Sequence, residues 1–117
     1  MVAKSERLAQ LSTRLALSKK AENIVVLDVR ELTSVTDFFV ICSGNSDTQI
    51  KAIADAIIEG LEKENVKIWH VEGYSGLRWV LLDYVDFVVH VFQEETRNFY
   101  GLERLWGDAK MKMIETN

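Results

Sequence analysis

The residues best suited to bind a phosphate form the short segment Gly44-Asn45-Ser46, between an apolar run and a helical pattern. Backbone N–H groups at a strand-to-helix junction can hold a phosphate, as they do in nucleotide-binding proteins. Nucleotidyl transfer also needs carboxylates on the next strand to hold metal ions, and the next predicted strand offers only Glu72. We therefore interpret Ser46 or Asp47 as a helix N-cap, and nucleotide binding or nucleotidyl transfer by this segment is the alternative function.

The two histidines and the single cysteine do not form a recognisable reactive site. His70 and His90 lie in predicted strands among apolar neighbours, and neither has a second ligand at a spacing typical of zinc sites. We interpret both as satisfied, partly buried imidazoles. Cys42 lies inside an apolar run, which favours a small buried side chain over a catalytic thiol. The sequence therefore predicts no catalytic residue, no metal site and no cofactor.

Acidic side chains are concentrated in the last third of the chain. Residues 83–108 hold six acidic and two basic side chains, so this segment alone accounts for the net charge of −4 of the whole chain. Nucleic-acid binders normally show the opposite bias, and we expect no direct DNA binding. An acidic surface suits a basic protein partner, and a solvated acidic face that serves solubility explains the charge equally well.

Aromatic residues are interleaved with these acids from residue 72 onward. Side chains alternate along a strand, which places Trp79, Leu81 and Asp83 on one face and Val80 and Leu82 on the other. Because Val80 and Leu82 can supply the core, we expect Trp79 and Leu81 to line an exposed or half-exposed surface.

The last helical pattern continues this aromatic segment. Phe99, Leu102 and Trp106 recur at helical spacing, and Tyr100 and Glu103 can flank that stripe. Aromatic anchors rimmed by acids are typical of protein-binding surfaces, whereas aromatic residues taken alone more often belong to a core.

These residues must be positioned by a mixed α/β fold. Apolar periodicity predicts the order αββαβββα, with helices over residues 5–21, 50–64 and 94–106 and strands over 24–29, 37–42, 67–71, 79–82 and 87–92. A mixed five-stranded sheet with flanking helices is the natural architecture. The 117 residues fit one domain, 1–117, with a core over about 5–109. No apolar run is long enough to cross a membrane, and we expect a cytoplasmic protein.

Several segments resemble the Iojap-type ribosomal silencing factors. They are residues 20–29, 36–41, 43–46 and 72–73, and above all 79–92 and 95–106, whose combination is highly specific. The resemblance covers roughly residues 5–109. Phe99 and Gly101 vary around the Tyr-x-Leu-Glu core of the motif, and the tail after Asp108 lies outside the pattern.

The resemblance implies an α/β fold related to the nucleotidyltransferases but without their catalytic acids. It implies a non-enzymatic translational repressor that binds the large-subunit ribosomal protein numbered fourteen and blocks joining of the small subunit when nutrients are scarce. Family members often form homodimers. The implied contact positions are Trp79, Asp83, Tyr84, Tyr100, Glu103 and Trp106, to which strand alternation adds Leu81.

Overall fold

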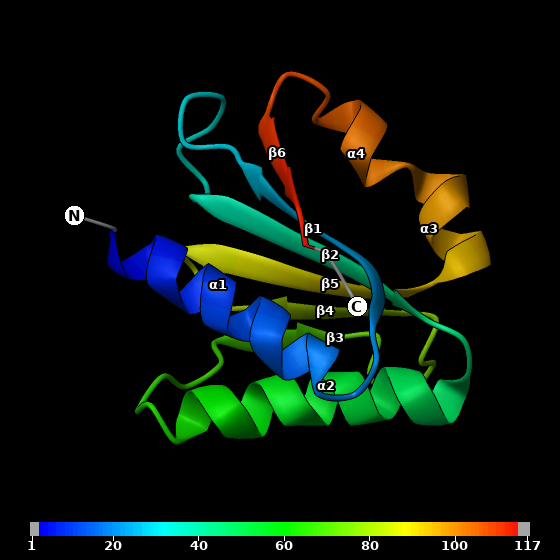
Figure 1. Cartoon of the computed structure of the whole chain (residues 1–117). Coiled ribbons are helices and arrows are strands. Elements are labelled where there is room, and N and C mark those ends of the chain that lie inside the picture. Colours follow the sequence, from blue (N-terminus) through cyan, green and yellow to red (C-terminus); the bar gives the residue numbers. More distant parts are fainter. Residues whose placement is uncertain (1–2, 115–117) are drawn as a thin grey trace.

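The computed structural model describes residues 3–114. They form a mixed β-sheet with helices on both of its faces (Figure 1). Along the chain the elements are α1 (Lys4–Leu17), β1 (Glu22–Asp28), β2 (Phe38–Gly44), α2 (Asp47–Glu62), β3 (His70–Glu72), β4 (Trp79–Asp83), β5 (Phe87–Gln93), α3 (Glu94–Tyr100), α4 (Leu102–Leu105) and β6 (Lys110–Met113). None of the helices within this range combines the length and apolar character needed to cross a bilayer.

The sheet of residues 3–114 has six strands in the order β3-β4-β5-β2-β1-β6. Strands β2 and β5 at its centre are parallel, and every other neighbouring pair is antiparallel. The prediction of a mixed α/β sheet with flanking helices is confirmed. The nucleotidyltransferase relationship of the fold stays a prediction.

The predicted count of five strands is wrong, because β6 pairs with β1 from Asp28↔Lys110 to Val25↔Met113. This strand lies beyond the expected core boundary at residue 109. Its four residues alternate Lys and Met but are all exposed, so their period-two pattern is a weak signal for a strand. The assignment of the whole of 1–117 to one domain stays a prediction, since residues 1–2 and 115–117 lie outside the described part.

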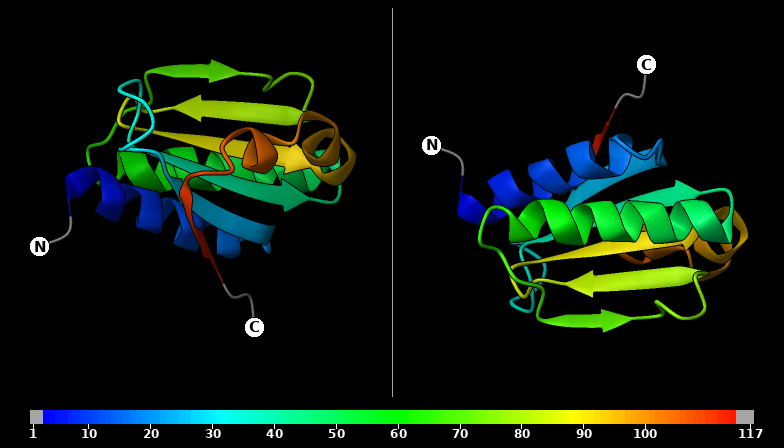
Figure 2. Two further views of the ribbon diagram at one scale, coloured as in Figure 1. Left: turned by 90° about the horizontal axis from the view of Figure 1, so that it is seen from above. Right: turned by 90° about the horizontal axis from the view of Figure 1, so that it is seen from below.

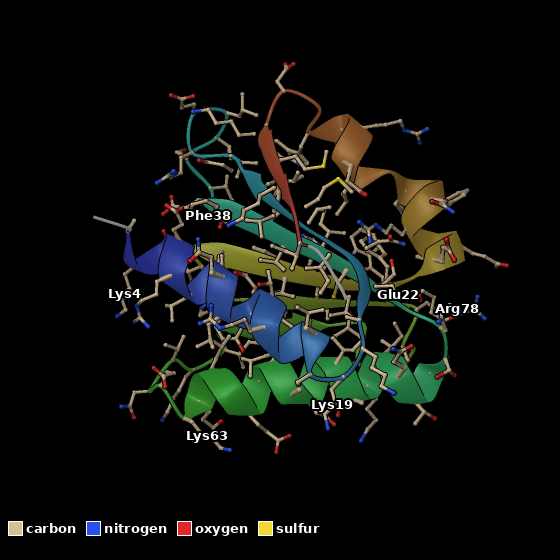
Figure 3. All side chains as sticks on the ribbon, viewed as in Figure 1. Lys4, Lys19, Glu22, Phe38, Lys63 and Arg78 are labelled. Carbon is tan, nitrogen blue, oxygen red and sulfur yellow. The ribbon has the colours of Figure 1, made fainter. Side chains whose placement is uncertain are left out.

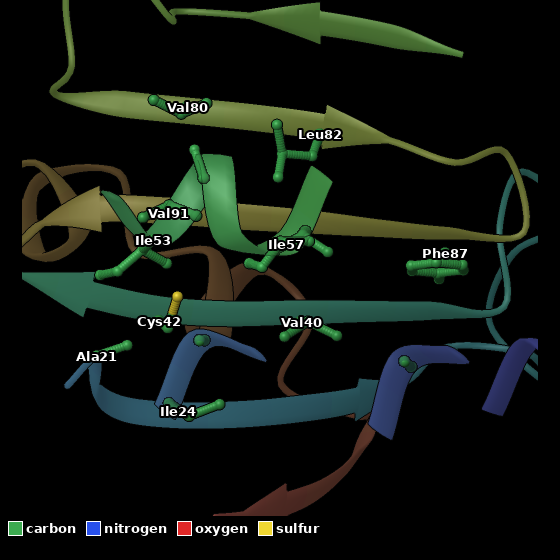
Figure 4. Packing of buried hydrophobic residues seen from close by; sticks show 14 of the residues in the cluster. Ala21, Ile24, Val40, Cys42, Ile53, Ile57, Val80, Leu82, Phe87 and Val91 are labelled. Atoms are coloured by element: carbon green, nitrogen blue, oxygen red, sulfur yellow. The ribbon is translucent and has the colours of Figure 1, made fainter. Parts of the chain in front are cut away.

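Helices α1 and α2 cover one face of the sheet, and together they enclose the larger core (Figure 2). Ile50, Ile53, Ile57 and Leu61 form the fully buried stripe of α2, at the spacing expected for one helical face. Figure 4 shows how side chains of the central strands meet α2, among them Val40, Cys42, Val80, Leu82 and Val91. Cys42 is fully buried as predicted, and burial raises the pKa of its thiol to about 12.

A glycine sets the close approach of these two helices. A Cβ added at Gly60 of α2 would lie 2.4 Å from the nearest methyl carbon of Leu15 of α1. Glycine therefore allows the backbone of α2 to pack directly on that side chain. Helix α1 itself ends at Leu17 rather than near residue 21, because the chain turns there and Lys20 adopts a left-handed φ of 62°.

The predicted helix over residues 94–106 is two short helices, α3 and α4. Gly101 separates them with a left-handed backbone, φ 57° and ψ 49°, and caps α3 by donating its N–H to the carbonyl of Arg97. Glycine adopts this conformation without the strain that a Cβ would bring. The break also shifts the helical phase, so residues before and after Gly101 do not share the predicted stripe.

Candidate functional site

The face of the sheet opposite α1 and α2 carries most of the aromatic residues selected from the sequence. Strand register pairs Trp79 with Phe92 and Leu81 with His90, and pairs His90 with Ile41, so these side chains project to one side. Helices α3 and α4 pack against this side (Figure 2). We call it the α3–α4 face. It is formed by Phe39, Ile41, Trp79, Leu81, His90 and Phe92 of the sheet, with Tyr100 of α3, Leu102 of α4 and Trp106, which caps α4.

Trp79 lies half-buried where β4 meets α3. Its ring centre is 4.8 Å from that of Phe92 and 4.7 Å from that of Tyr100. The indole Nε1–H donates a hydrogen bond to Nδ1 of His90 at 3.1 Å. Trp79 is thus held on three sides while part of its ring stays accessible, which agrees with the expected half-exposed surface.

Contacts between rings continue across the sheet. The imidazole of His90 meets Phe39 with ring centres 5.3 Å apart, and Phe39 meets Trp106 at the same separation. Five rings, from Tyr100 through Trp79, His90 and Phe39 to Trp106, therefore form one row from α3 to α4. Spacings of this size are typical of attractive aromatic pairs. The row fixes both short helices on the sheet.

An open pocket of about 520 Å³ lies between α3 and the chain that leads into β4. Phe99 is 79% exposed and Tyr100 is 52% exposed. The ring of Tyr100 contacts the half-buried indole of Trp79, and the ring of Phe99 contacts that of Tyr100 edge-on. Figure 3 shows Arg78 at the end of the sheet where α3 begins. The pocket is lined by Gly73, Gly76, Arg78, Trp79, Glu95, Thr96, Phe99 and Tyr100.

A buried arginine joins α3 to the rest of this face. Arg97 is 7% exposed, and its Nη1 donates to Oγ of Ser43 at 2.8 Å. Its Nε and Nη2 both donate to Oε2 of Glu103, at 3.1 and 3.0 Å. The carboxylate of Glu103 is therefore already engaged inside the protein. Its direct contribution is to hold α4 in place.

Leu81 and Asp83 follow Trp79 on the same face of β4, and both are half-buried. Oδ1 of Asp83 accepts a hydrogen bond from the backbone N–H of Val85 at 2.8 Å. Val85 has a φ of 72°, a strained value for a β-branched residue. The carboxylate of Asp83 thus stabilises the tight turn between β4 and β5.

Tyr84 lies on the other face of the sheet, contrary to the contact position that the resemblance implied. It is 7% exposed, belongs to the core under α1 and α2, and stacks on Phe87 with ring centres 4.9 Å apart. Burial raises the pKa of its phenol. Because Asp83 points to the α3–α4 face, the next residue along the chain points away from it. We therefore leave Tyr84 out of the candidate surface.

The polar groups of the segment 44–46 are used by the fold itself. Oγ of Ser46 accepts the backbone N–H of Gln49 at 3.1 Å, which confirms the predicted N-cap of α2. The backbone N–H of Asn45 donates to Oε1 of Gln49 at 2.7 Å. Asp47 accepts a hydrogen bond from Gln93 at 2.6 Å. A phosphate at this junction would compete with these internal hydrogen bonds, which argues against the alternative function.

A family model described as "Ribosomal silencing factor during starvation" matches residues 2–117. The chain belongs to this family. The ribosomal silencing factor RsfS of Halalkalibacterium halodurans is 41% identical over 111 residues, which cover 95% of each chain. RsfS of Bacillus subtilis is 45% identical over 97 residues, covering 83% of this chain and 82% of the relative. A crystal structure of a Chromobacterium violaceum protein superposes with a TM-score of 0.87 at 30% identity, covering 97% of this chain and 96% of that chain.

Membership in the ribosomal silencing factor family confirms the resemblance found in the sequence. The chloroplastic Iojap protein of Zea mays is also similar, at 40% identity over 90 residues that cover 77% of this chain and 39% of the relative. The protein is therefore a ribosome-associated factor that silences translation. Its family is named for silencing and not for a catalysed reaction.

Two residues of this silencing factor were missed as site residues. The first is Phe99, which was predicted to share an apolar stripe with Leu102 and Trp106, but the helix is interrupted at Gly101 and the Phe99 ring is exposed. The vicinity of an exposed Glu95 and a glycine could have signalled this. The second is His90, which accepts a hydrogen bond from Trp79. The two residues are eleven positions apart on neighbouring strands, and only the strand register brings them together.

Proposed function

We propose that the protein lowers translation by docking its α3–α4 face on the large ribosomal subunit, through the large-subunit protein numbered fourteen. The bound protein then prevents the small subunit from joining. This proposal extends the silencing role that the family carries to a named surface and a named partner. It rests mainly on one observation, the exposed rings of Phe99 and Tyr100 beside the half-buried Trp79.

Exposed aromatic rings around a held indole support a protein partner. Interfaces derive most of their affinity from a few aromatic or arginine anchors in well-packed pockets. Trp79 is fixed by Phe92, Tyr100 and His90, so little side-chain freedom remains to be lost when a partner covers it. Leu81 and Trp106 extend the same face toward the sheet and α4.

The charge around the pocket supports a basic partner. Glu94 and Glu95 are exposed in the first turn of α3, next to the exposed rings. Arg97, one of the two basic residues in the segment 83–108, is buried and paired with Glu103. The charges of this pair cancel. The exposed charges of this region are then those of Glu94, Glu95 and Asp108 against Arg78 and Arg104, which leaves a small acidic excess. Ribosomal proteins that contact RNA are expected to be basic, which makes the two surfaces complementary.

Steric exclusion is sufficient for the proposed silencing. The molecule measures 35 × 33 × 30 Å along its principal axes. A body of this size bound on the intersubunit side of the large subunit would occupy space that the small subunit needs. No catalytic step is required, and no nucleotide or metal enters the proposal.

Three further features belong to the proposal. Silencing acts when nutrients are scarce, which the starvation term in the family description supports. It takes place in the cytoplasm, where the ribosomes of bacterial relatives work. The free protein forms a homodimer, for which the exposed edge strand β6, with Met111 and Met113 at 52% and 71% exposure, offers an apolar surface.

Binding of the purified protein to isolated large subunits, small subunits and protein fourteen tests the proposal directly. We expect binding to large subunits and to protein fourteen, and none to small subunits. Trp79→Ala should weaken binding by at least about 2 kcal/mol, as loss of an interface anchor does. Trp69→Ala is the matched control, since Trp69 is 70% exposed and immediately precedes edge strand β3. Equal loss in both variants, or equal affinity for both subunits, would refute the assigned surface.

A further inference from the structure

His90 lies at the centre of the α3–α4 face and is almost completely enclosed. It is 5% exposed, on the central strand β5. Leu81 of β4 and Ile41 of β2 are its direct strand partners. The rings of Phe39 and Phe92 pack against the imidazole, with centres 5.3 and 6.1 Å away. An apolar side chain would fill such a place more easily than an imidazole does.

The two nitrogens of this imidazole have different surroundings. Nδ1 accepts the indole N–H of Trp79 at 3.1 Å, so the neutral ring carries its proton on Nε2. Nε2 is buried and has no hydrogen-bond partner among residues 3–114. Burying an N–H without a partner is unfavourable. The stability of the fold therefore gains little from this histidine, and its one polar contact is the bond to Trp79.

The hydrogen bond between His90 and Trp79 fixes the rotation of the indole, which the apolar contacts do not. The contacts with Phe92 and Tyr100 determine where the indole lies. Contacts between rings are compatible with several rotations of a tryptophan side chain, so they do not determine its orientation. A hydrogen bond is directional and selects the rotation in which Nε1 faces β5. In this orientation Trp79 lines the open pocket that Phe99 and Tyr100 border.

We propose that His90 is a positioning residue for docking, which fixes the indole of Trp79 in the orientation that the ribosomal partner meets. This inference rests on the proposed function, in which Trp79 is an anchor. It assigns to a buried residue, which has almost no surface of its own to offer a partner, a measurable share of the binding affinity. It also explains why a polar side chain occupies an otherwise apolar site.

Three substitutions separate this role from a merely structural one. His90→Leu removes the acceptor and fills the space. His90→Asn keeps an acceptor oxygen near the place of Nδ1, whereas His90→Gln carries its polar end near the place of Nε2. We expect His90→Leu and His90→Gln to weaken binding to large subunits about tenfold, and His90→Asn to stay within about threefold of the native protein.

Melting temperatures should not follow the binding data. We expect His90→Leu to melt within about 4 °C of the native protein, or above it, because the substitution removes a buried N–H without a partner. A structural role would instead lower the melting temperature and the affinity together. If His90→Leu does not fold, the comparison of the Asn and Gln variants carries the test.

The indole N–H of Trp79 reports the mechanism without any partner. Trp79→Phe identifies its signal among the three tryptophan side chains in an ¹⁵N-labelled spectrum. Hydrogen exchange of this N–H should be slow in the native protein and in His90→Asn, and faster in His90→Leu. In a Trp79→Ala background, His90→Leu should cause no further loss of binding, since the residue being positioned is gone.

The possible results distinguish this inference from the proposed function. Unchanged affinity of His90→Leu, or unchanged exchange of the Trp79 indole, would overturn the positioning role. A further loss of binding in the Trp79→Ala background would show that His90 acts by another route. If the native protein does not bind large subunits, the proposed function fails, and the exchange measurement still decides whether His90 orients Trp79.

Discussion

Glu103 holds its carboxylate 3.0 Å from the buried guanidinium of Arg97, and this ion pair joins α4 to α3 across the break at Gly101. The guanidinium also donates to Ser43 at the end of β2. Two helices of seven and four residues are too short to be stable alone, so they depend on such contacts and on the row of rings beneath them.

Arg97→Met should therefore lower the free energy of unfolding by about 3 kcal/mol, because it leaves Ser43 and the partly buried Glu103 without their common partner. Glu103→Gln keeps one acceptor oxygen and should cost only about 1 kcal/mol. Urea unfolding measures both values. Arg104→Met, which removes an exposed arginine from α4, should change stability by less than about 0.5 kcal/mol. Equal effects of Arg97→Met and Arg104→Met would contradict a structural role of this pair.

Phe99→Ala offers the cleanest separation of binding from folding. The ring is 79% exposed and contacts Tyr100 edge-on, so its removal should change the free energy of unfolding by less than about 0.5 kcal/mol. Affinity for large subunits should fall about tenfold, corresponding to about 1.4 kcal/mol. Val35→Ala, at a position that is 81% exposed in the loop between β1 and β2, is the control. Native affinity of the Phe99 variant would remove the pocket from the docking surface.

His90 makes stability depend on pH. Burial lowers the pKa of its imidazole to about 4, from the ordinary value of 6.5. Between these values the unfolded chain binds a proton that the folded protein does not, so stability is complete above about pH 6.5 and falls as the pH is lowered toward 4. The full loss is about 3 kcal/mol. Urea unfolding at several pH values should show this loss in the native protein. His90→Asn should lose less stability over this pH range. If the free energies of unfolding of the two proteins fell in parallel, the folded native protein would be taking up the proton on His90.

Salt should act mainly on the rate of association. The exposed acids of α3 are expected to attract a basic partner. Raising the ionic strength from about 0.05 M to about 0.5 M should therefore slow association more than it speeds dissociation. Stopped-flow or surface-binding kinetics measure both rates. The Glu94→Gln and Glu95→Gln double variant should reduce this salt dependence. An association rate that does not respond to salt would indicate docking by apolar contact alone.

Strand alternation was sufficient to predict which residues of β4 share a face. Val80 and Leu82 are fully buried beneath the long helices, and Trp79 and Leu81 are half-buried on the other face, as predicted. The helical pattern of α2 and its Ser46 cap could also be predicted from the sequence, because both depend on local spacing. The same alternation places Tyr84 with Val80 and Leu82. The sequence resemblance, which compares positions and not faces, had suggested a contact there.

Features that depend on backbone conformation or on distant pairing could not be derived. A single left-handed glycine, Gly101, divides the last predicted helix, so that Phe99 does not share a buried stripe with Leu102 and Trp106. The pairing of β6 with β1 joins residues that are far apart in the chain, and its four residues are all exposed, so apolar periodicity gives a weak signal. Arg97 appears in the sequence as an ordinary surface base, and only the fold brings it to Ser43.

Under the proposed function, docking through the α3–α4 face keeps the ribosomal subunits apart. The most direct test follows joining of purified large and small subunits by light scattering, with increasing amounts of the native protein and of the Phe99→Ala and Tyr100→Ala double variant. We predict that the native protein lowers joining in proportion to the large subunits it occupies. The double variant should need at least about a hundredfold higher concentration, if each ring contributes about 1.4 kcal/mol. Phe99→Ala alone leaves the row of rings intact, and it should need about tenfold more at a near-native melting temperature. Undiminished joining at saturating native protein would refute the silencing by exclusion of the small subunit, and equal inhibition by the double variant would refute docking through the α3–α4 face.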